Sequence, residues 1–429
     1  MPAPNRPRAP SSVTFVCRGH PQISASHTKT VEFTRDADVT GRATCVLGVR
    51  SEHDDREIGR LRGDVEVTLE CGDERDSFTA TMSAFFLGDD GLVFRCGPGL
   101  RGRTVAFDAD KSAADISRDL VRTLKDPAAD LRVTIRELGT GDRRGALFVV
   151  SVPIGNDDDL TPRARRVLEA ADLVLAEDTR RFRDLTSRAM LHVEGRVVSY
   201  HDHNESERAG EVLAQLELGA RVALVSDAGT PLFSDPGYVV VSSAVEAGFA
   251  VSPVPGASSL LAVLSASGLA VDRFTYVGFL PRRAAARQAE IRRLTERGDA
   301  FVVHEAPRRV GGLLADLAAV CPAWELCIGR EVTKVFEEFR RGTASALATE
   351  MGDVDDARGE FTVVVAPPAG SRQPASESDI ASDVQLDRLV RALLDQGVTP
   401  KTVAKALGEL PGMSHKQAYE RVLAIAERR

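Results

Sequence analysis

Three short glycine-bearing turns, each directly after an apolar stretch, constrain the fold of this chain more than any other feature. They are VPIGN at residues 152–156, SDAGTP at 226–231 and VPGASS at 254–259. The apolar stretches have strand length and alternate with helical patterns, which favours a largely parallel sheet covered on both faces. Because turns at the carboxyl ends of such strands line a crevice, we expect a pocket built largely from backbone.

Composition narrows the class of protein. Hydrophobic residues make up 43% of the chain and charged residues 28%, which is typical of globular proteins, and no apolar run reaches the roughly 18 residues of a spanning helix. The six cysteines are scattered without a Cys-x-x-Cys pair, which argues against a disulfide or zinc framework. A net charge of −8 argues against an overall basic coat for nucleic acid. We therefore expect a cytoplasmic protein that does not bind membranes.

The pattern of apolar residues changes along the chain. Short β-type runs dominate up to residue 138, with one helical pattern at 112–124, whereas strands alternate with longer helices after the linker-like GTGDRR at 139–144. A polar segment rich in proline and serine precedes three amphipathic helical patterns at the end. We predict a disordered lead-in (1–12), an α+β domain (13–140), two α/β subdomains (145–271 and 272–367), a linker (368–383) and a helical module (384–429).

The three turns suit a ligand site better than a purely structural role. A single turn of this kind is usually structural, and the dinucleotide fingerprint Gly-x-Gly-x-x-Gly is missing. However, acidic residues also stand at two of the strand ends, Asp178 in LAEDTR and Asp227 in VSDAG. Glycine lets a ligand approach the main chain because it has no Cβ. Together these features favour a backbone-lined binding pocket.

The motifs of residues 145–367 resemble one family closely. VPIGN, AEDTRR, SYHDHNE, LVSDAGTPLFSDPG, VPGASS, GFLPRR, HEAPRR, GREVTKVFEEF and GEFTVVV occur in the order typical of the ribosomal small-subunit RNA (cytidine 2′-O) methyltransferases, within the tetrapyrrole methylase superfamily. PIGN combined with SDAGTP distinguishes this group from the porphyrin methylases, which carry a Gly-x-Gly-Pro-Gly turn in the first position. The C-terminal helices also resemble the tail of that family.

The resemblance implies a fold, a cofactor and a reaction. It implies two α/β subdomains with S-adenosylmethionine in the cleft between them, usually in a homodimer, and 2′-O-methylation of a cytidine in the decoding region of 16S RNA. Two features depart from the family pattern, namely Leu232-Phe233 in place of glycine-isoleucine and the acidic run at 157–159. The cofactor-binding candidates are Pro153, Ile154, Gly155, Asp178, Asp227, Ala228, Gly229, Thr230, Pro255, Gly256, Ala257 and Ser258.

Methyl transfer to a hydroxyl needs a group that accepts the proton, and strand ends near the cleft are where it would lie. The candidates are Glu305, Lys334, Glu337 and Glu360. For each of them a structural ion pair is an equally good interpretation, so no general base is assigned. His201 and His203 alternate as a metal pair would, but no third ligand is evident, and we predict a positioning role and no metal site.

RNA binding requires cations, and paired arginines stand at several loop mouths. Arginine suits phosphate because its planar fork donates two parallel hydrogen bonds. We interpret Arg287, Arg292, Arg293 and Arg297 instead as the surface of a helix. The RNA-binding candidates are Arg180, Arg181, Arg282, Arg283, Arg308 and Arg309.

The region before the methylase-like part resembles a mostly archaeal family of unknown function, through RGHPQISASHTKTVEFT, ATCVLGV and AFDADKSAADISRDLVRTL. The sequence does not indicate what this domain does. Two alternatives to the leading hypothesis stay open. One is a superfamily relative that methylates a tetrapyrrole or the modified histidine of elongation factor 2 (the diphthine type). The other is a non-catalytic RNA-binding factor in ribosome assembly.

Overall fold

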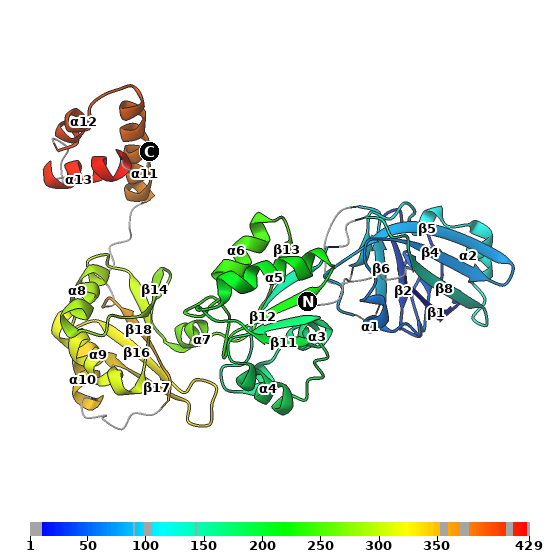
Figure 1. The fold of residues 1–429 in the computed structure, drawn as a ribbon, viewed down its shortest axis with the longest axis horizontal. Coiled ribbons are helices and arrows are strands. Elements are labelled where there is room, and N and C mark those ends of the chain that lie inside the picture. The colour runs from blue at the N-terminus through cyan, green and yellow to red at the C-terminus, as the bar shows by residue number, and fades with distance from the viewer. Residues whose placement is uncertain are drawn as a thin grey trace.

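The computed structural model describes residues 11–88, 91–97, 104–141, 144–351, 359–368, 377–408 and 415–426. Four parts follow one another along the chain: a sheet-rich N-terminal domain, two α/β subdomains and a helical module (Figure 1). This arrangement confirms the predicted fold class. The predicted lead-in, for residues 1–10, and the predicted linker, for residues 369–376, lie outside the described residues. Both predicted segments were too long, because the first strand already begins at Ser12 and the first helix of the C-terminal module begins at Glu377.

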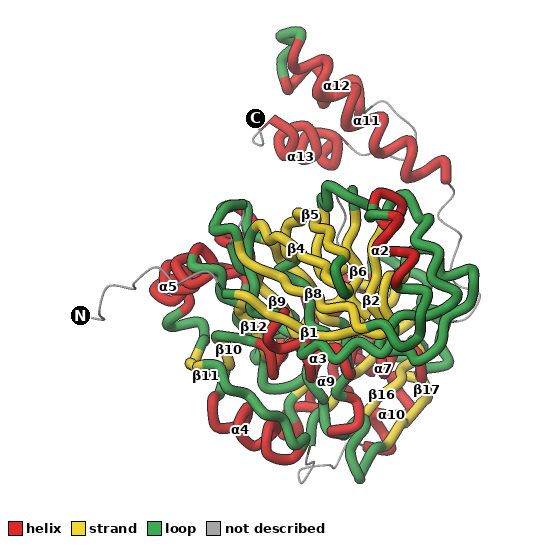
Figure 2. The backbone as a smooth tube through the Cα atoms, turned by 90° about the vertical axis from the view of Figure 1, so that its right-hand side faces the viewer, coloured by secondary structure: helices red, strands yellow, loops and turns green. Residues whose placement is uncertain are grey.

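The N-terminal domain is built on one mixed sheet of eight strands in the order β1-β8-β4-β5-β7-β6-β2-β3. Its strands are visible edge to edge in Figure 2. The strands are β1 (Ser12–Arg18), β2 (Thr30–Thr34), β3 (Val46–Gly48), β4 (Asp64–Cys71), β5 (Glu74–Met82), β6 (Gly91–Arg95), β7 (Thr104–Phe107) and β8 (Asp130–Glu137). A short helix, α1 (Asp55–Ile58), lies between β3 and β4.

The helix predicted over residues 112–124 is interrupted. A 3₁₀ turn (Ala113–Asp115) is followed by α2 (Arg118–Thr123), because Ile116 is extended, with ψ 142°. Ser117 then begins the second helix, since its side chain accepts a hydrogen bond from the backbone N–H of Leu120. The helical pattern in the sequence did not reveal the new N-cap.

The first α/β subdomain contains five parallel strands in the order β11-β10-β12-β9-β13. Strands β10 and β12 are buried along their whole length, as parallel strands covered on both faces should be. The strands are β9 (Ala146–Val150), β10 (Leu173–Ala176), β11 (Arg196–Ser199), β12 (Arg221–Val225) and β13 (Ala250–Val254). The helices are α3 (Pro162–Ala170), α4 (Thr179–Arg188), α5 (Glu205–Glu217) and α6 (Tyr238–Glu246).

The second subdomain differs in that only β14 and β15 pair in parallel, and the other three pairings are antiparallel. Its strand order is β14-β15-β18-β16-β17. The strands are β14 (Phe274–Phe279), β15 (Ala300–Glu305), β16 (Glu325–Arg330), β17 (Glu338–Thr343) and β18 (Phe361–Ala366). The helices are α7 (Ser259–Ala266), α8 (Ala284–Thr295), α9 (Pro307–Val320) and α10 (Ala344–Met351). Helix α7 precedes the predicted boundary at residue 272 but packs against β16 and β18 of this sheet.

One arginine of α8 contradicts the sequence interpretation. Arg287 does not coat the surface: its side chain is buried and its Nη2 lies 2.6 Å from Asp316 Oδ2 on α9. A buried guanidinium needs a carboxylate partner, and that partner lies on a neighbouring helix that spacing within α8 cannot reveal.

The C-terminal module consists of α11 (Glu377–Asp395), α12 (Pro400–Leu407) and α13 (His415–Ala426). It has a small core of its own that includes Val390, Val403 and Val422. No helix within the described ranges is long and apolar enough to cross a membrane.

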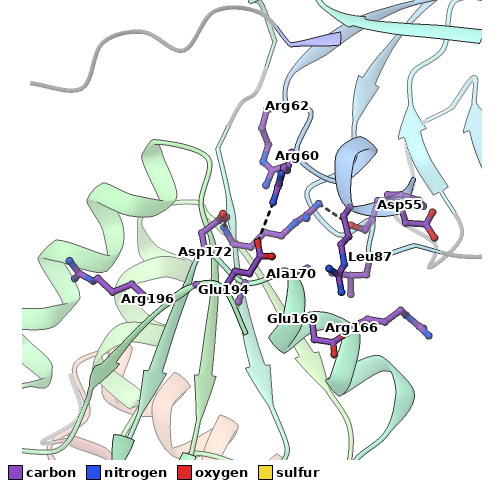
Figure 3. Close-up of a pocket in the computed structure, with 15 residues that line it drawn as sticks. Asp55, Arg60, Arg62, Leu87, Arg166, Glu169, Ala170, Asp172, Glu194 and Arg196 are labelled. Atoms are coloured by element: carbon purple, nitrogen blue, oxygen red, sulfur yellow. Dashed lines mark hydrogen bonds and ion pairs between the residues drawn. The ribbon is translucent and has the colours of Figure 1, made fainter. Parts of the chain in front are cut away.

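The N-terminal domain contacts the first subdomain at the amino ends of the parallel strands. Its loop at residues 83–87 inserts Phe85 into the subdomain core, where the ring lies edge-on to Phe148 at 5.7 Å. Arg221, at the start of β12, is 4% exposed and donates from Nη2 to the carbonyl oxygen of Phe86 at 2.9 Å. Around these contacts lies a polar pocket of about 460 Å³, across which Arg60 reaches Glu194 (Figure 3).

Candidate active site

The three glycine-bearing turns meet at the opposite, carboxyl ends of the same strands. Val152 and Gly229 exchange two backbone hydrogen bonds, of 2.9 and 3.1 Å, which join the first turn to the second. The Thr230 hydroxyl lies 2.8 Å from the Ser151 hydroxyl and donates to the carbonyl oxygen of Ala257 at 3.2 Å, which joins the second turn to the third. The three turns therefore form one hydrogen-bonded scaffold.

Gly229 stands where the three turns converge. Its φ is +80°, a conformation that side chains rarely tolerate. A Cβ at this position would lie 3.3 Å from Ile154 Cγ2 and 3.7 Å from the carbonyl oxygen of Ala257. The sequence needs glycine here both for the backbone conformation and for close contact with the other two turns.

A cleft of about 400 Å³ opens in front of this scaffold, with residues of both α/β subdomains in its walls. This volume lies within the range of about 300–1,000 Å³ that small-molecule sites occupy. The cofactor candidates that line it are Ile154, Asp227, Ala228, Gly229, Thr230 and Ser258. The candidates that are not part of its lining are Pro153, Gly155, Asp178, Pro255, Gly256 and Ala257.

Asp178 does not line the cleft but supports a residue that does. It caps α4 by accepting from the backbone N–H of Arg180 at 2.8 Å, and its own N–H donates to Asp227 Oδ1 at 3.0 Å. Hydrogen bonds to Arg180 lower the pKa of Asp178. Asp178 therefore helps to hold Asp227 in place, and Asp227 is the one of the two that lines the cleft.

Two acidic residues that were not among the sequence-based candidates, Glu177 and Asp235, also line the cleft. Burial raises the pKa of Glu177, and the nearby Asp227 raises it further. Burial is likewise the main cause that raises the pKa of Asp235, to about 7, with Glu177 adding to it. Asp235 belongs to the family motif LVSDAGTPLFSDPG, so its position in that motif was the available signal.

The catalytic candidates separate into two groups. Glu305 and Glu360 line the cleft, whereas Lys334 and Glu337 are not part of its lining. Glu305 is 2% exposed and is held by Arg309, whose Nη2 lies 3.0 Å from its Oε2. Lys334 pairs with Glu331 at 2.9 Å and with Glu360 at 3.3 Å. Glu337 accepts from the backbone N–H of Thr333 at 2.7 Å. These contacts are those of structural ion pairs and loop anchors.

The arginine candidates also divide. Arg181 lines the cleft and its Nε lies 3.4 Å from Asp227 Oδ2, while Arg180 is bound to Asp178. A second, open groove adjoins the cleft and is lined by Arg282, Arg308 and Arg309. The last candidate, Arg283, is the N-cap residue of α8 and lines neither the cleft nor the groove.

The histidine pair has local partners. The side-chain oxygen of Asn204 accepts from the backbone N–H of His201 at 2.9 Å, and the rings of His201 and His203 are 6.0 Å apart. Within the part of the chain that the structure describes, no group of three or more His, Cys, Asp or Glu side chains is placed to hold a metal ion.

Family models match the two larger parts of the chain. The model for Tetrapyrrole (Corrin/Porphyrin) Methylases matches residues 146–348, the region that carries the cleft. The model described as Domain of unknown function (DUF371) matches residues 15–138, the N-terminal sheet. The cleft-bearing part is thus a tetrapyrrole-type methylase, and both predicted resemblances are confirmed.

Curated relatives define the family more closely. "Ribosomal RNA small subunit methyltransferase I" of Micromonospora olivasterospora is 41% identical over 284 residues, which cover 66% of this chain and 88% of that protein. The protein of the same name from Xylella fastidiosa (strain Temecula1) is 39% identical over 277 residues, 64% of this chain and 98% of that protein. The chain therefore belongs to the ribosomal RNA small subunit methyltransferase I family.

A solved structure, uroporphyrin-III C-methyltransferase from Thermus thermophilus, is 24% identical with a TM-score of 0.37, and the match covers 52% of this chain and 94% of that chain. The family assignment rests on the sequence relatives.

Proposed function

We propose that this protein transfers a methyl group from S-adenosylmethionine to the ribose 2′-hydroxyl of a cytidine in the decoding region of small-subunit (16S) ribosomal RNA. The observation that carries the proposal is the cleft in front of the three joined turns, in a chain that covers 88% and 98% of two relatives named ribosomal RNA small subunit methyltransferase I. The choice of ribose and cytidine follows the family resemblance of the motifs.

The residues of the cleft fit such a cofactor. The turn at Gly229 leaves main-chain atoms accessible where a side chain would fill the space. Asp227 and Glu177 offer carboxylate oxygens that suit the hydroxyl and ammonium donors of a nucleoside linked to an amino acid. Ile154 and Leu260 supply apolar wall. Backbone, carboxylates and a few apolar groups are the usual composition of a small-molecule site.

The reaction joins the ribose oxygen to a methyl carbon, and the proton of the hydroxyl must leave. When bound, S-adenosylmethionine supplies an electrophilic methyl group carried on a sulfonium sulfur. The contribution of the protein is to bring the hydroxyl into line and to hold a proton acceptor nearby. Exclusion of water by the two subdomain walls would strengthen both effects.

We propose Asp235 as the proton acceptor. It lines the cleft, and its pKa of about 7, raised mainly by burial, suits a group that must bind and release a proton near neutral pH. Glu305 is a weaker candidate because Arg309 already engages its carboxylate. Glu360 pairs with Lys334. Asp235 thus replaces the four candidates chosen from sequence as the leading one.

The partners follow from the same proposal. The substrate is small-subunit RNA, either free or in an assembled subunit. The protein acts in the cytoplasm as a homodimer and does not bind membranes. Arg181 lines the cleft, Arg282 and Arg308 line the adjoining groove, and these three arginines are proposed to contact the RNA backbone.

In vitro methylation of 30S subunits and of free 16S RNA, followed by nuclease digestion and mass spectrometry, tests the proposed function. We expect a single 2′-O-methylated cytidine that depends on S-adenosylmethionine. Methyl transfer to a base, a protein or a tetrapyrrole without any ribose product would contradict it. Calorimetric titration with the cofactor tests the scaffold alternative, which predicts no binding.

A further inference from the structure

The mouth of the cleft carries a continuous row of aromatic rings. Phe233 lies 6.1 Å from Tyr276, Tyr276 lies 5.4 Å from His304, and His304 lies 6.0 Å from Phe279, measured between ring centroids. All four side chains line the cleft. Phe233 and Phe279, at the two ends of the row, are each 56% exposed. Large apolar rings that stay exposed at the edge of a polar site do not serve core packing, so their exposure calls for another explanation.

A β-bulge creates one half of this row. Tyr276 and Phe279 are three residues apart, so a regular strand would place them on opposite faces. In β14, however, the register shifts between Tyr276 and Gly278, and Gly278 has a φ of +71°. Tyr276 then pairs with Val302 and Phe279 with His304, two residues further along β15. The bulge therefore brings both rings to the same face.

A loop with a strained backbone carries Phe233, the ring at the other end of the row. Leu232 and Ser234, on either side of Phe233, have φ values of +76° and +71°, which are unusual for residues with side chains. Leu232 packs against the core of the first subdomain, and the Ser234 hydroxyl lies 2.7 Å from that of Tyr276. These two anchors hold the loop so that Phe233 points away from the core. Such strain is concentrated at functional sites.

The charged residues differ between the groove beyond Phe279 and the interior of the cleft. Beyond Phe279 the cleft continues into the open groove, with which it shares Phe279, Ala306 and Pro307. Arg282 and Arg308 line that groove, are exposed and make no side-chain hydrogen bond or ion pair with any described residue. The interior of the cleft is acidic instead. A phosphate would therefore be attracted to the groove and repelled from the interior.

We infer that the aromatic row stacks the base of an unpaired nucleotide, the one whose ribose enters the cleft, while Arg282 and Arg308 bind phosphates of the adjoining RNA strand. The inference rests on the proposed function. Stacking on aromatic rings is how proteins hold bases that have left a helix, and it accepts any base. The row thus requires an RNA segment that is single-stranded or opened at the target, and it leaves the choice of nucleotide to other contacts.

Binding of a short single-stranded RNA to the full chain, saturated with S-adenosylhomocysteine, is the direct test, with fluorescence anisotropy as the readout. Phe233→Ala and Phe279→Ala should each weaken RNA binding by roughly 5- to 100-fold, the range for loss of one stacked base. Phe233→Tyr should restore binding to within about twofold, since a phenol stacks as well. Phe274→Ala is the matched control, because Phe274 is an exposed ring on β14 that does not line the cleft.

Three outcomes would overturn the inference. Unchanged RNA affinity in both alanine variants would remove the stacking role. Loss of cofactor affinity in a calorimetric titration would assign the row to the cofactor. A shift toward monomers in sedimentation would assign it to an interface between copies. Because RNA binding is measured without turnover, a wild-type protein that binds RNA through these rings but forms no 2′-O-methylcytidine would contradict the proposed function and still support the stacking contact itself.

Discussion

The two ends of the five-stranded parallel sheet have opposite designs. At the amino ends, the N-terminal domain packs Phe85 into the subdomain core, and its Phe86 carbonyl oxygen accepts a hydrogen bond from Arg221 of β12, which is almost fully buried. At the carboxyl ends, three turns are tied together by hydrogen bonds and leave a cleft in front of them. The same strands therefore support a contact with the N-terminal domain, here called the joint, at one end and the candidate site at the other.

The comparison shows how each end of the sheet accommodates polar and charged groups. At the joint, polar groups are satisfied by backbone carbonyls, as in Arg62, whose Nε donates to Gly219 at 2.9 Å. At the cleft, burial raises the pKa values of Glu177 and Asp235, and neighbouring carboxylates raise them further. Such pKa shifts lower stability at neutral pH and are typical of sites that bind or react. Substitutions at the two ends should consequently fail in different ways.

The largest effect is expected from Gly229→Arg at the cleft end. The positive φ disfavours any side chain and a Cβ would already lie 3.3 Å from Ile154 Cγ2, so an arginine would strain the turn and crowd the space beside the backbone. We expect the affinity for S-adenosylmethionine to fall by at least about 100-fold, or roughly 2.7 kcal/mol. Calorimetric titration measures it. Gly298→Arg is the control, because Gly298 also has a positive φ, +70°, but faces open space. Normal affinity in Gly229→Arg would show that the pocket lies elsewhere.

Asp235→Asn should have a smaller effect, confined to the chemical step. Because the carboxylate form accepts the proton, the wild-type rate should rise with pH through a midpoint near 7. The variant should lose that rise and react on the order of 100-fold more slowly, the lower range for loss of a general base.

The raised pKa of Asp235 has a second consequence, for stability. The folded state holds the proton more tightly than the unfolded chain, whose aspartate pKa is near 3.8, so the stability contributed by protonated Asp235 is lost as pH rises toward 7. Asp235→Asn should therefore unfold no more easily than wild type above pH 7. Single-turnover rates across pH measure the effect on the rate, and thermal melts measure the effect on stability.

Glu337→Gln, outside the cleft lining, is the control for the rate and should change it less than about twofold. An Asp235→Asn rate that still followed the wild-type pH profile would remove Asp235 from the mechanism.

The smallest effect on activity, and a clear one on stability, is expected from Phe85→Ala at the joint. Loss of the ring from the subdomain core should lower the free energy of unfolding by about 2–3 kcal/mol, below the value for a fully buried phenylalanine because Phe85 is partly exposed. Cofactor affinity should stay within about twofold of wild type. Urea denaturation and calorimetry measure the two quantities. Phe336→Ala, which removes a ring that is 76% exposed, should change stability by less than about 0.5 kcal/mol. A fall in cofactor affinity in Phe85→Ala would show that the two ends of the sheet are coupled.

Much of the fold was predictable because local patterns decide it. The strands of the first subdomain are apolar runs that end in turns, and Thr161 with Pro162 forms the N-cap and first turn of α3. The antiparallel pairing of β16, β17 and β18 was not predictable, because run length and apolarity do not specify strand direction. The split of the helix at 112–124 depends on one extended residue, Ile116, that periodicity does not detect.

The candidate site was predictable where the main chain builds it and less so where side chains complete it. The three turns carry their own sequence signal, and all three contribute residues to the cleft. By contrast, the aromatic row depends on a bulge at Gly278 and on a loop from the other subdomain, so its members are far apart in sequence. Lys334 and Glu337 looked equivalent to Glu305 in sequence, and only their contacts separate them.

The loop at residues 83–87 has a practical consequence for anyone who divides the chain. The two family matches meet between residues 138 and 146, which invites the use of a fragment that starts at the methylase. Such a fragment would lose the ring that packs against Phe148 and the carbonyl acceptors of Arg221, and would expose to water an apolar spot and an arginine that is buried in the full chain. The border between the two family matches is therefore crossed by packing, because the loop at residues 83–87 contacts the first α/β subdomain.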